Sequence, residues 1–237
     1  MGGGQGGPQR DVSSQRGQAP PALPKEVRDA LPADAARAWC KLASHLPEAL
    51  YLAGGAAAAL RLHHRVSQDL DFFYHRRAVD LAALERELAT LGFAVTYRAP
   101  GTLRGLLGTT KVEFLHADEA GAQKRLEQPE LVAGVRVAGF KDLMAMKLKV
   151  LAERGDLRDY YDVMRIDEQG GVSVEDGIAL YLERYGLDRA SDALGHLVRA
   201  LGYLEDADED ESLSTSKAEL TAWWRRRQAQ VIRNLGW

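Results

Sequence analysis

The hydrophobic periodicity of this 237-residue chain changes once, near residue 140, and that change limits the folds open to it. Before it, short apolar runs with a strand-like period of two alternate with helical segments; after it, only helical spacing of three and four residues remains. Strands are expected at 51–53, 70–74, 93–97, 103–107, 111–115 and 135–137, and helices at 34–46, 56–62 and 80–91. The later helices are expected at 143–153, 157–166, 174–185, 190–204 and 217–234. This order predicts an α+β fold in which a small mixed sheet with flanking helices precedes a helical domain.

The chain is expected to have three parts. Residues 1–24 are rich in Gly, Gln, Pro and Ser and lack the apolar block of a signal peptide, so they are predicted to be a disordered tail. Residues 25–140 would form the first domain and residues 141–237 the helical one. No stretch approaches the ~20 apolar residues of a membrane span, which makes the cytoplasm the default location.

Charge and cysteine content exclude several classes of protein. A formal net charge of -3 argues against a protein that coats nucleic acid non-specifically. The single cysteine, Cys40, excludes a disulfide framework and a thiolate metal cage, and it is expected to be a buried apolar residue of a helix.

Asp69 and Asp71 are the first candidate for chemistry. On a strand, side chains two residues apart project from one face, so the two carboxylates should lie together. Two like charges held that close raise each other's pKa unless a cation lies between them. Apolar neighbours at Leu70 and Phe72-Phe73 indicate a buried strand, which adds to the need for a compensating partner. Hard oxygen ligands suit Mg²⁺, which accepts substrate phosphate oxygens as further ligands.

Two further features have open interpretations. Gly54-Gly55, between a strand and a helix, would let the backbone approach a phosphate at a helix N-terminus, although an ordinary tight turn has the same sequence. Glu113 alternates with the apolar residues Val112 and Phe114. A strand paired beside 70–74 could bring Glu113 to the same metal ions, or Glu113 could simply face solvent.

Together these features resemble the DNA polymerase beta nucleotidyltransferase superfamily, and more narrowly the AbiEii/AbiGii toxin family. The narrower resemblance is carried by Leu-Ala-Gly-Gly-Ala-Ala-Ala-Ala-Leu, followed by His-Arg-Val-Ser-Gln-Asp-Leu-Asp-Phe-Phe. A second block, Lys147-Leu-Lys-Val-Leu-Ala-Glu-Arg154 and then Arg158-Asp-Tyr-Tyr-Asp162, is similar to that family's Lys-x-x-Ala-Leu-x-x-Arg and Lys/Arg-Asp-x-x-Asp. Ala56 stands where the family usually has Thr, and Glu113 where it more often has Asp.

The resemblance implies a Mg²⁺-dependent enzyme that transfers a nucleoside monophosphate from an NTP. The implied metal ligands, for two Mg²⁺ ions, are Asp69, Asp71 and Glu113, and the implied catalytic residues are Asp69, Asp71, Lys147 and Asp162. The implied nucleotide-binding residues are Gly54, Gly55, Arg65, Ser67, Arg154, Arg158 and Asp159. Lys147 and Arg154, seven apart, are expected on one helix face. An interhelical ion-pair network is the other interpretation of this second block. For Ser67, the other interpretation is a residue that only turns the chain before the strand.

Several functional alternatives stay open at the level of sequence. The acceptor is expected to be RNA, such as a tRNA end, with the chain acting as a toxin that an antitoxin protein restrains. A second alternative is an enzyme with a small-molecule acceptor, as in antibiotic-modifying nucleotidyltransferases. A third is an inactive homologue that serves as a binding partner. Arg225, Arg226 and Arg227, next to Trp223-Trp224, could grip RNA or form a solvated helix face. His63 and His64 are interpreted as loop residues without a ligand role.

Overall fold

The computed structural model describes residues 23–75, 78–118 and 121–236, so residues 1–22 of the predicted N-terminal tail lie outside it. Seven strands form one mixed sheet in the order β3-β4-β5-β2-β1-β7-β6. The strands are β1 (Tyr51–Ala53), β2 (Leu70–Tyr74), β3 (Phe93–Ala99), β4 (Thr102–Leu107), β5 (Thr110–His116), β6 (Glu130–Val132) and β7 (Val135–Val137). The pairs β2–β5 and β1–β7 are parallel, and the other neighbouring strands are antiparallel.

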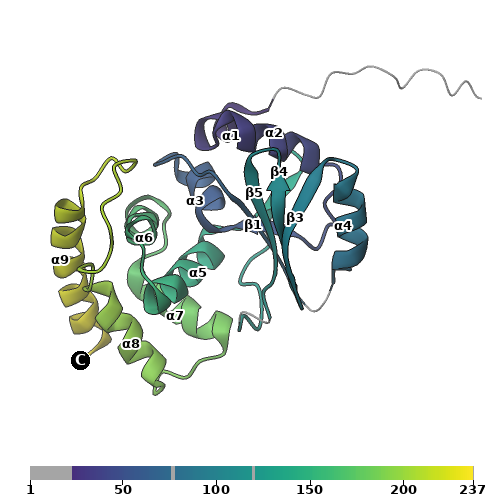
Figure 1. The fold of residues 1–237 in the computed structure, drawn as a ribbon. Helices are drawn as coiled ribbons and strands as arrows, with labels where there is room; N and C mark the ends of the chain where they lie inside the picture. The colour runs from purple at the N-terminus through teal and green to yellow at the C-terminus, as the bar shows by residue number, and fades with distance from the viewer. Residues whose placement is uncertain (1–22, 76–77, 119–120, 237) are drawn as a thin grey trace, which may run out of the picture.

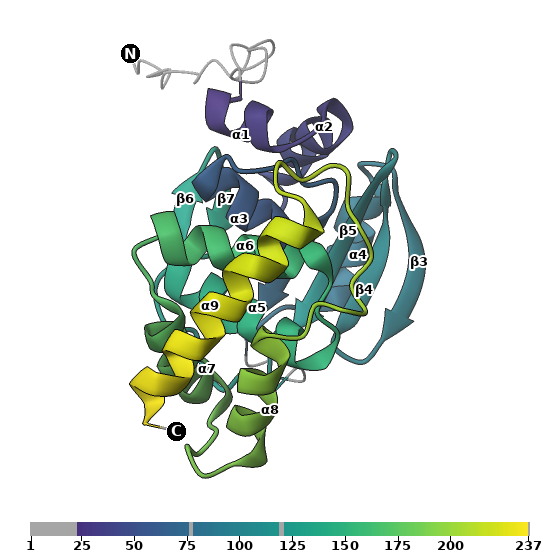
Figure 2. The ribbon, with the colours of Figure 1, turned by 90° about the vertical axis from the view of Figure 1, so that its left-hand side faces the viewer.

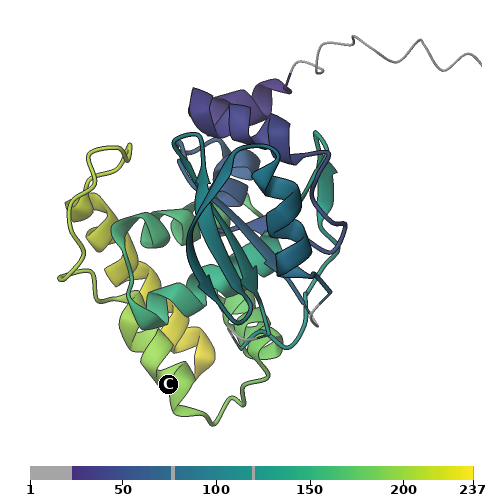
Figure 3. The same ribbon diagram turned by 45° about the vertical axis from the view of Figure 1, so that its right-hand side comes forward.

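Helices cover the sheet and then continue alone. The helices of the first half are α1 (Lys25–Ala30), α2 (Ala33–Leu42), α3 (Gly54–Leu62) and α4 (Leu81–Ala89). The C-terminal helices are α5 (Phe140–Glu153), α6 (Leu157–Gln169), α7 (Val174–Tyr185), α8 (Asp192–Leu201) and α9 (Lys217–Leu235). Helix α4 lies on the side of the sheet away from the C-terminal helices (Figures 1 and 3). Helix α9 crosses the outer side of the helical half (Figure 2). The predicted α+β architecture, a mixed sheet followed by helices, is confirmed.

The apolar core is continuous from the sheet into the helical half. One cluster of buried side chains includes Leu52 and Phe72 of the sheet as well as Leu148 and Val163 of α5 and α6. Helix α3 packs against both α5 and α6, so the helix that follows the glycine pair is held between the two halves. Strand β7 ends at Val137 and α5 begins at Phe140, and the core runs across this change from sheet to helix. The division into two domains at residue 140 stays a prediction.

Some predicted elements differ from the structure. Cys40 is exposed, and its predicted burial is wrong, because the buried face of α2 is formed by Ala35, Ala38, Trp39 and Leu42. Position 40 is turned about 100° from Trp39 and faces solvent. Helix α2 ends at Leu42 rather than at residue 46. The short helix α1 and the strand β6 were not predicted. Strand β6 lies at the edge of the sheet with no buried residue, so it lacks the apolar pattern that revealed the equally short β1 and β7.

Arg184 links the C-terminal helices to one another through a buried ion pair and to the sheet through a hydrogen bond. The guanidinium of Arg184, on α7, pairs with the carboxylate of Asp142, on α5, and both side chains are almost completely buried. Nη2 of the same guanidinium donates to Tyr51 Oη of β1 at 3.0 Å, and Nη1 donates to the carbonyl of Lys124 at 3.2 Å. Removing one member of such a pair leaves the other charge buried without compensation.

We therefore expect Arg184→Met to lower the free energy of unfolding by about 3–5 kcal/mol. Adding Asp142→Leu should recover part of this loss, since the stranded charge is then removed as well. Urea denaturation of the two variants tests this, with Lys25→Met as a control, because Lys25 forms an exposed pair with Asp29. Equal stability of wild type and Arg184→Met would contradict the assignment of Arg184 as a structural link.

Candidate active site

The glycine pair lies directly against the Asp71 carboxylate. Strand β1 ends at Ala53, and α3 begins at Gly54, whose φ of +66° lies in the left-handed region that favours glycine. A Cβ placed on Gly54 would lie 2.9 Å from Asp71 Oδ2, and one on Gly55 would lie 2.7 Å from Arg65 Nη2 and 3.1 Å from Ser67 Oγ. Side chains larger than hydrogen would therefore displace the predicted site residues. The two glycines bring backbone, carboxylate, guanidinium and hydroxyl together at a helix N-terminus.

The sheet register brings Glu113 beside Asp71. Strands β2 and β5 are parallel neighbours, and Asp71 is the register partner of Glu113. The adjacent pairs, Leu70 with Val112 and Phe72 with Phe114, have no solvent exposure and form the core face. The carboxylates consequently project from the opposite face. Asp69, one residue before β2, is exposed, and its charge acts on Asp71.

Asp71 is the acidic residue most affected by this arrangement. Burial, followed by the negative charges of Glu113 and Asp69, raises its pKa to about 6, against the opposing effect of Lys111 and Lys147. A carboxyl group that titrates near neutrality among other carboxylates is typical of a functional site. The second sequence block lies beside the first one, because Arg65, next to Gly55, donates to both oxygens of Asp162.

The donor set suits a hard cation, although it is not assembled in the metal-free chain. Asp69, Asp71 and Glu113 offer only carboxylate oxygens, as Mg²⁺ prefers. Glu113, however, is paired with Arg104 Nε at 3.1 Å and with Lys111 Nζ at 2.5 Å. Over the residues that the structure describes, no three acidic, His or Cys side chains are close enough to hold a metal ion. A metal site here therefore fits Asp69 and Asp71 directly, and Glu113 only after it leaves its two cations.

A buried ionic cluster holds the second block against this site. Lys147 Nζ lies 2.7 Å from Asp159 Oδ1 and 2.7 Å from Asp162 Oδ2. Arg65 donates to both oxygens of Asp162, from Nε at 2.6 Å and from Nη2 at 2.7 Å. Burial alone would raise the pKa of Asp162, but Lys147, Arg65 and His64 lower it well below its usual range. The sequence left open a network or a direct role for this block. The structure shows the network, and Asp162 is fully buried within it.

His64 is a member of this cluster that the sequence analysis missed. Its Nε2 lies 2.7 Å from Asp162 Oδ1, and its side chain has no solvent exposure. Burial lowers the pKa of His64, although Asp162 raises it, so the imidazole is expected to be neutral at neutral pH. His64 does lie in a loop, as predicted, but it is packed against Tyr161 with ring centroids 5.3 Å apart. In the sequence, only its position directly before Arg65 indicated that His64 could belong to the same cluster.

Arg154 and Arg158 are not brought into the cluster. Helix α5 ends at Glu153, and Arg154 has a non-helical φ of -141°, followed by Gly155 at φ +61°. The prediction that Lys147 and Arg154 share a helix face is therefore wrong. The Arg154 side chain is exposed and lies 3.9 Å from Asp156, while Arg158 is exposed and lies 3.5 Å from Asp210.

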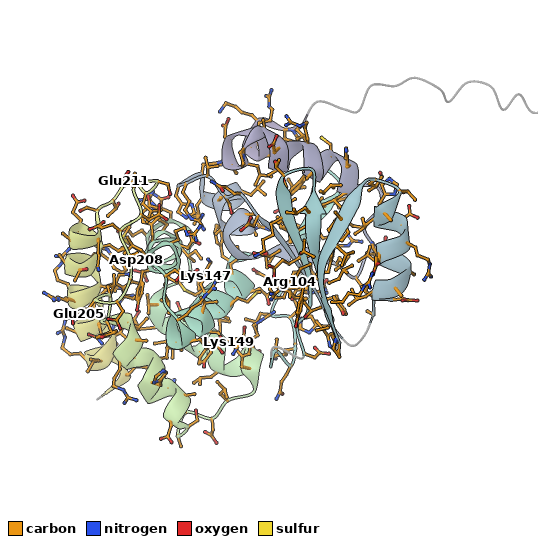
Figure 4. The ribbon with its side chains drawn as sticks, in the orientation of Figure 1. Arg104, Lys147, Lys149, Glu205, Asp208 and Glu211 are labelled. Atoms are coloured by element: carbon orange, nitrogen blue, oxygen red, sulfur yellow. The ribbon has the colours of Figure 1, made fainter. Side chains whose placement is uncertain are left out.

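The arginines of α9 are divided between structure and solvent. Trp224 is completely buried. Arg227 bonds to Asp167 and Glu175, which ties α9 to α6 and α7. Arg225 and Arg226 are exposed. The acidic run Glu205–Glu211 is a loop and lies on the side of the helical half away from the sheet (Figure 4).

Comparison with known proteins identifies the family. Residues 37–235 match the family described as nucleotidyl transferase AbiEii toxin, type IV TA system, and this match spans most of the chain. The chain belongs to the AbiEii family. It is thus a nucleotidyltransferase-family toxin of the type IV toxin–antitoxin kind, and both blocks of the expected resemblance lie inside the matched range. A protein of Aquifex aeolicus, aq_aa25, is 29% identical over 218 residues, which are 90% of this AbiEii chain and 98% of that protein.

Solved structures with a related fold are more distant from this AbiEii protein. The antibiotic-resistance factor ANT(2'')-Ia is 18% identical, with a TM-score of 0.48, and the alignment covers 60% of this chain and 86% of that one. JHP933 of Helicobacter pylori is 14% identical, with a TM-score of 0.44 and coverages of 91% and 97%. At this level of similarity neither an acceptor nor a mechanism can be transferred. Among the described helices, none is long and apolar enough to span a membrane.

The raised pKa of Asp71 predicts a pH-dependent stability. A carboxyl group whose folded pKa is about 6, above its ordinary 3.8, destabilises the metal-free fold when ionised. This penalty is fully present above pH 6 and absent below pH 4. We expect Asp71→Asn to raise the free energy of unfolding in EDTA at pH 8 by roughly 1–3 kcal/mol, and to leave it unchanged near pH 3.5. Asp208→Asn, at an exposed loop position, serves as the control. If Asp71→Asn raised the free energy of unfolding by the same amount at both pH values, the raised pKa of Asp71 would be contradicted.

Proposed function

We propose that this AbiEii protein transfers a nucleoside monophosphate from an NTP to an RNA acceptor, such as a tRNA end, in a Mg²⁺-dependent reaction. The observation that carries the proposal is the contact between Gly54, at the start of α3, and the carboxylate of Asp71. A phosphate-accepting backbone turn and a metal-binding carboxylate are thereby in one place, which is what a nucleotidyl transfer site requires. The toxin role carries with it a partner antitoxin protein that restrains the activity.

The triphosphate would lie at the N-terminus of α3. Backbone N–H groups of the first turn are directed along the helix axis and favour an anion. Arg65 and Ser67 lie next to Gly55, so a guanidinium and a hydroxyl are available to phosphate oxygens. Arg65 is already bound at two atoms by Asp162, which fixes its position before a substrate arrives.

Asp69, Asp71 and Glu113 would hold two Mg²⁺ ions. When bound, these ions would lower the pKa of the acceptor hydroxyl and offset the charge that develops at the α-phosphate. In the transfer, the acceptor oxygen bonds to the α-phosphorus while the bond to the bridging oxygen of the β-phosphate breaks. Pyrophosphate leaves, and the acceptor proton is released to solvent.

Lys147 would supply the positive charge opposite these carboxylates. Its charge acts on Asp71, and Asp159 and Asp162 hold its ammonium group from the other side. Asp162, being fully buried, would act by positioning Lys147 and Arg65 rather than by touching substrate. Arg154 and Arg158, which pair with Asp156 and Asp210, have no role in this proposal.

The proposal is tested by incubating the purified protein with Mg²⁺, each α-labelled NTP in turn, and total RNA. We expect label in RNA from at least one NTP, and its loss in Asp71→Ala and Asp69→Ala to below a tenth of wild type, because removal of a metal ligand removes transition-state stabilisation. Circular dichroism should show that both variants are folded.

Asp208→Ala is the matched control, since it removes an exposed carboxylate of the acidic loop, away from the sheet (Figure 4). Retention of more than a tenth of the activity in Asp71→Ala would remove the site assignment. Label that enters only small molecules, with none in RNA, would contradict the RNA acceptor while leaving the transfer chemistry in place.

A further inference from the structure

A row of paired residues leads from Asp71 across the sheet to its edge. Asp71 is the register partner of Glu113 on β5, Glu113 of Arg104 on β4, and Arg104 of Tyr97 on β3. Directly paired residues of neighbouring strands project from the same face. The face that carries the proposed metal ligands therefore continues over β5, β4 and β3. Tyr97 lies three strands from Asp71, about 14 Å at the usual strand spacing.

This outer part of the face is open to solvent. Alternate residues of β4, Leu103 and Leu107, are buried on the side where α4 packs, while Arg104 and Leu106 point the other way. Tyr97 is 50% exposed and Leu106 is 39% exposed, which makes them two of the few large exposed apolar side chains among the described residues. We call the residues Tyr97, Arg104, Leu106 and Lys111 the platform.

The platform combines an aromatic ring with an excess of positive charge. Arg104 lies over the Tyr97 ring, with its guanidinium carbon 5.2 Å from the ring centroid. Arg104 and Lys111 both pair with Glu113, so two cations share one carboxylate. Their side chains are 44% and 51% exposed, which leaves both available to a ligand. In Figure 4, Arg104 lies on the side of the sheet that faces the helical half with Lys147.

We propose that the platform binds the single-stranded end of the RNA acceptor, with a base stacked on Tyr97 and backbone phosphates at Arg104 and Lys111. The assignment rests on the proposed function, because it places the RNA on the face that ends at Asp71. Aromatic side chains in a basic groove are how proteins hold single-stranded nucleic acid. A cationic small-molecule acceptor would gain nothing from Arg104 and Lys111, and a neutral peptide would not need them.

Binding of a fluorescein-labelled single-stranded oligoribonucleotide, followed by anisotropy with Mg²⁺ and without NTP, tests the proposal directly. We expect Tyr97→Ala to raise the Kd about tenfold, within the range of base–aromatic stacking, and Tyr97→Phe to restore most of the affinity. Arg104→Gln should weaken binding and make the slope of log K against log salt shallower by about one. Tyr97 is half exposed and Arg104 is partly exposed, so circular dichroism should show that both variants are folded at the assay temperature.

Matched controls are Tyr203→Ala, at another exposed tyrosine, and Arg98→Gln, at an exposed arginine that pairs with Glu85 instead. The controls should bind as wild type does. The platform is overturned if the wild-type protein does not bind the oligonucleotide, or if Tyr97→Ala and Arg104→Gln bind as tightly as the controls. A third outcome is that these variants lose binding, but the wild-type protein transfers no label to RNA. That result would contradict the proposed reaction and leave the platform as an RNA-binding face.

Discussion

The arrangement of the site depends on one buried carboxylate, that of Asp162. Lys147 from α5, and Arg65 and His64 from the loop between α3 and β2, all converge on it from within 2.7 Å. An ionised group with no solvent exposure is tolerated only when its partners and hydrogen bonds compensate the lost hydration. The cluster therefore joins the helical half to the loop that leads into β2. It fixes Arg65 beside Gly55 and Lys147 opposite Asp71, the two positions at which a triphosphate and its metal ions would meet positive charge.

Asp71, unlike Asp162, has other carboxylates rather than cations as the charged neighbours that most affect its pKa. Its carboxylate is buried close to Gly54, and this burial, together with the charges of Glu113 and Asp69, raises its pKa to about 6. Glu113 meanwhile is held by Arg104 and Lys111. Such crowding of carboxylates costs stability, and under the proposed function a bound cation would offset that cost. The same exchange of partners would free Arg104 and Lys111 for the phosphates of an acceptor, which links the metal site to the platform.

The sequence predicts the central part of this structure well, because the strands there are set by local pattern. The expected bounds of β1, β2 and β7 agree with the structure. For Glu113 the sequence left two interpretations open, and the structure has the one in which its strand pairs beside 70–74. Other features depend on tertiary context. Cys40 is one position off the buried stripe of α2, and Arg154 is removed from its helix by Gly155. His64 has no pattern of its own, and its contact with Asp162 spans 98 positions of the chain. Arg104 could be recognised only from the registers of two strand pairs.

The central claim is that the glycine turn and Asp71 form a single site for a metal-bound NTP. A crystal structure of the protein with Mn²⁺ and a non-hydrolysable NTP analogue tests it most directly, because anomalous scattering locates the metal independently of the protein atoms. The account predicts Mn²⁺ bound by Asp69 and Asp71, the triphosphate on the backbone of Gly54 and Gly55, and Glu113 turned from Arg104 to the metal. Mn²⁺ or triphosphate bound away from these residues would contradict it.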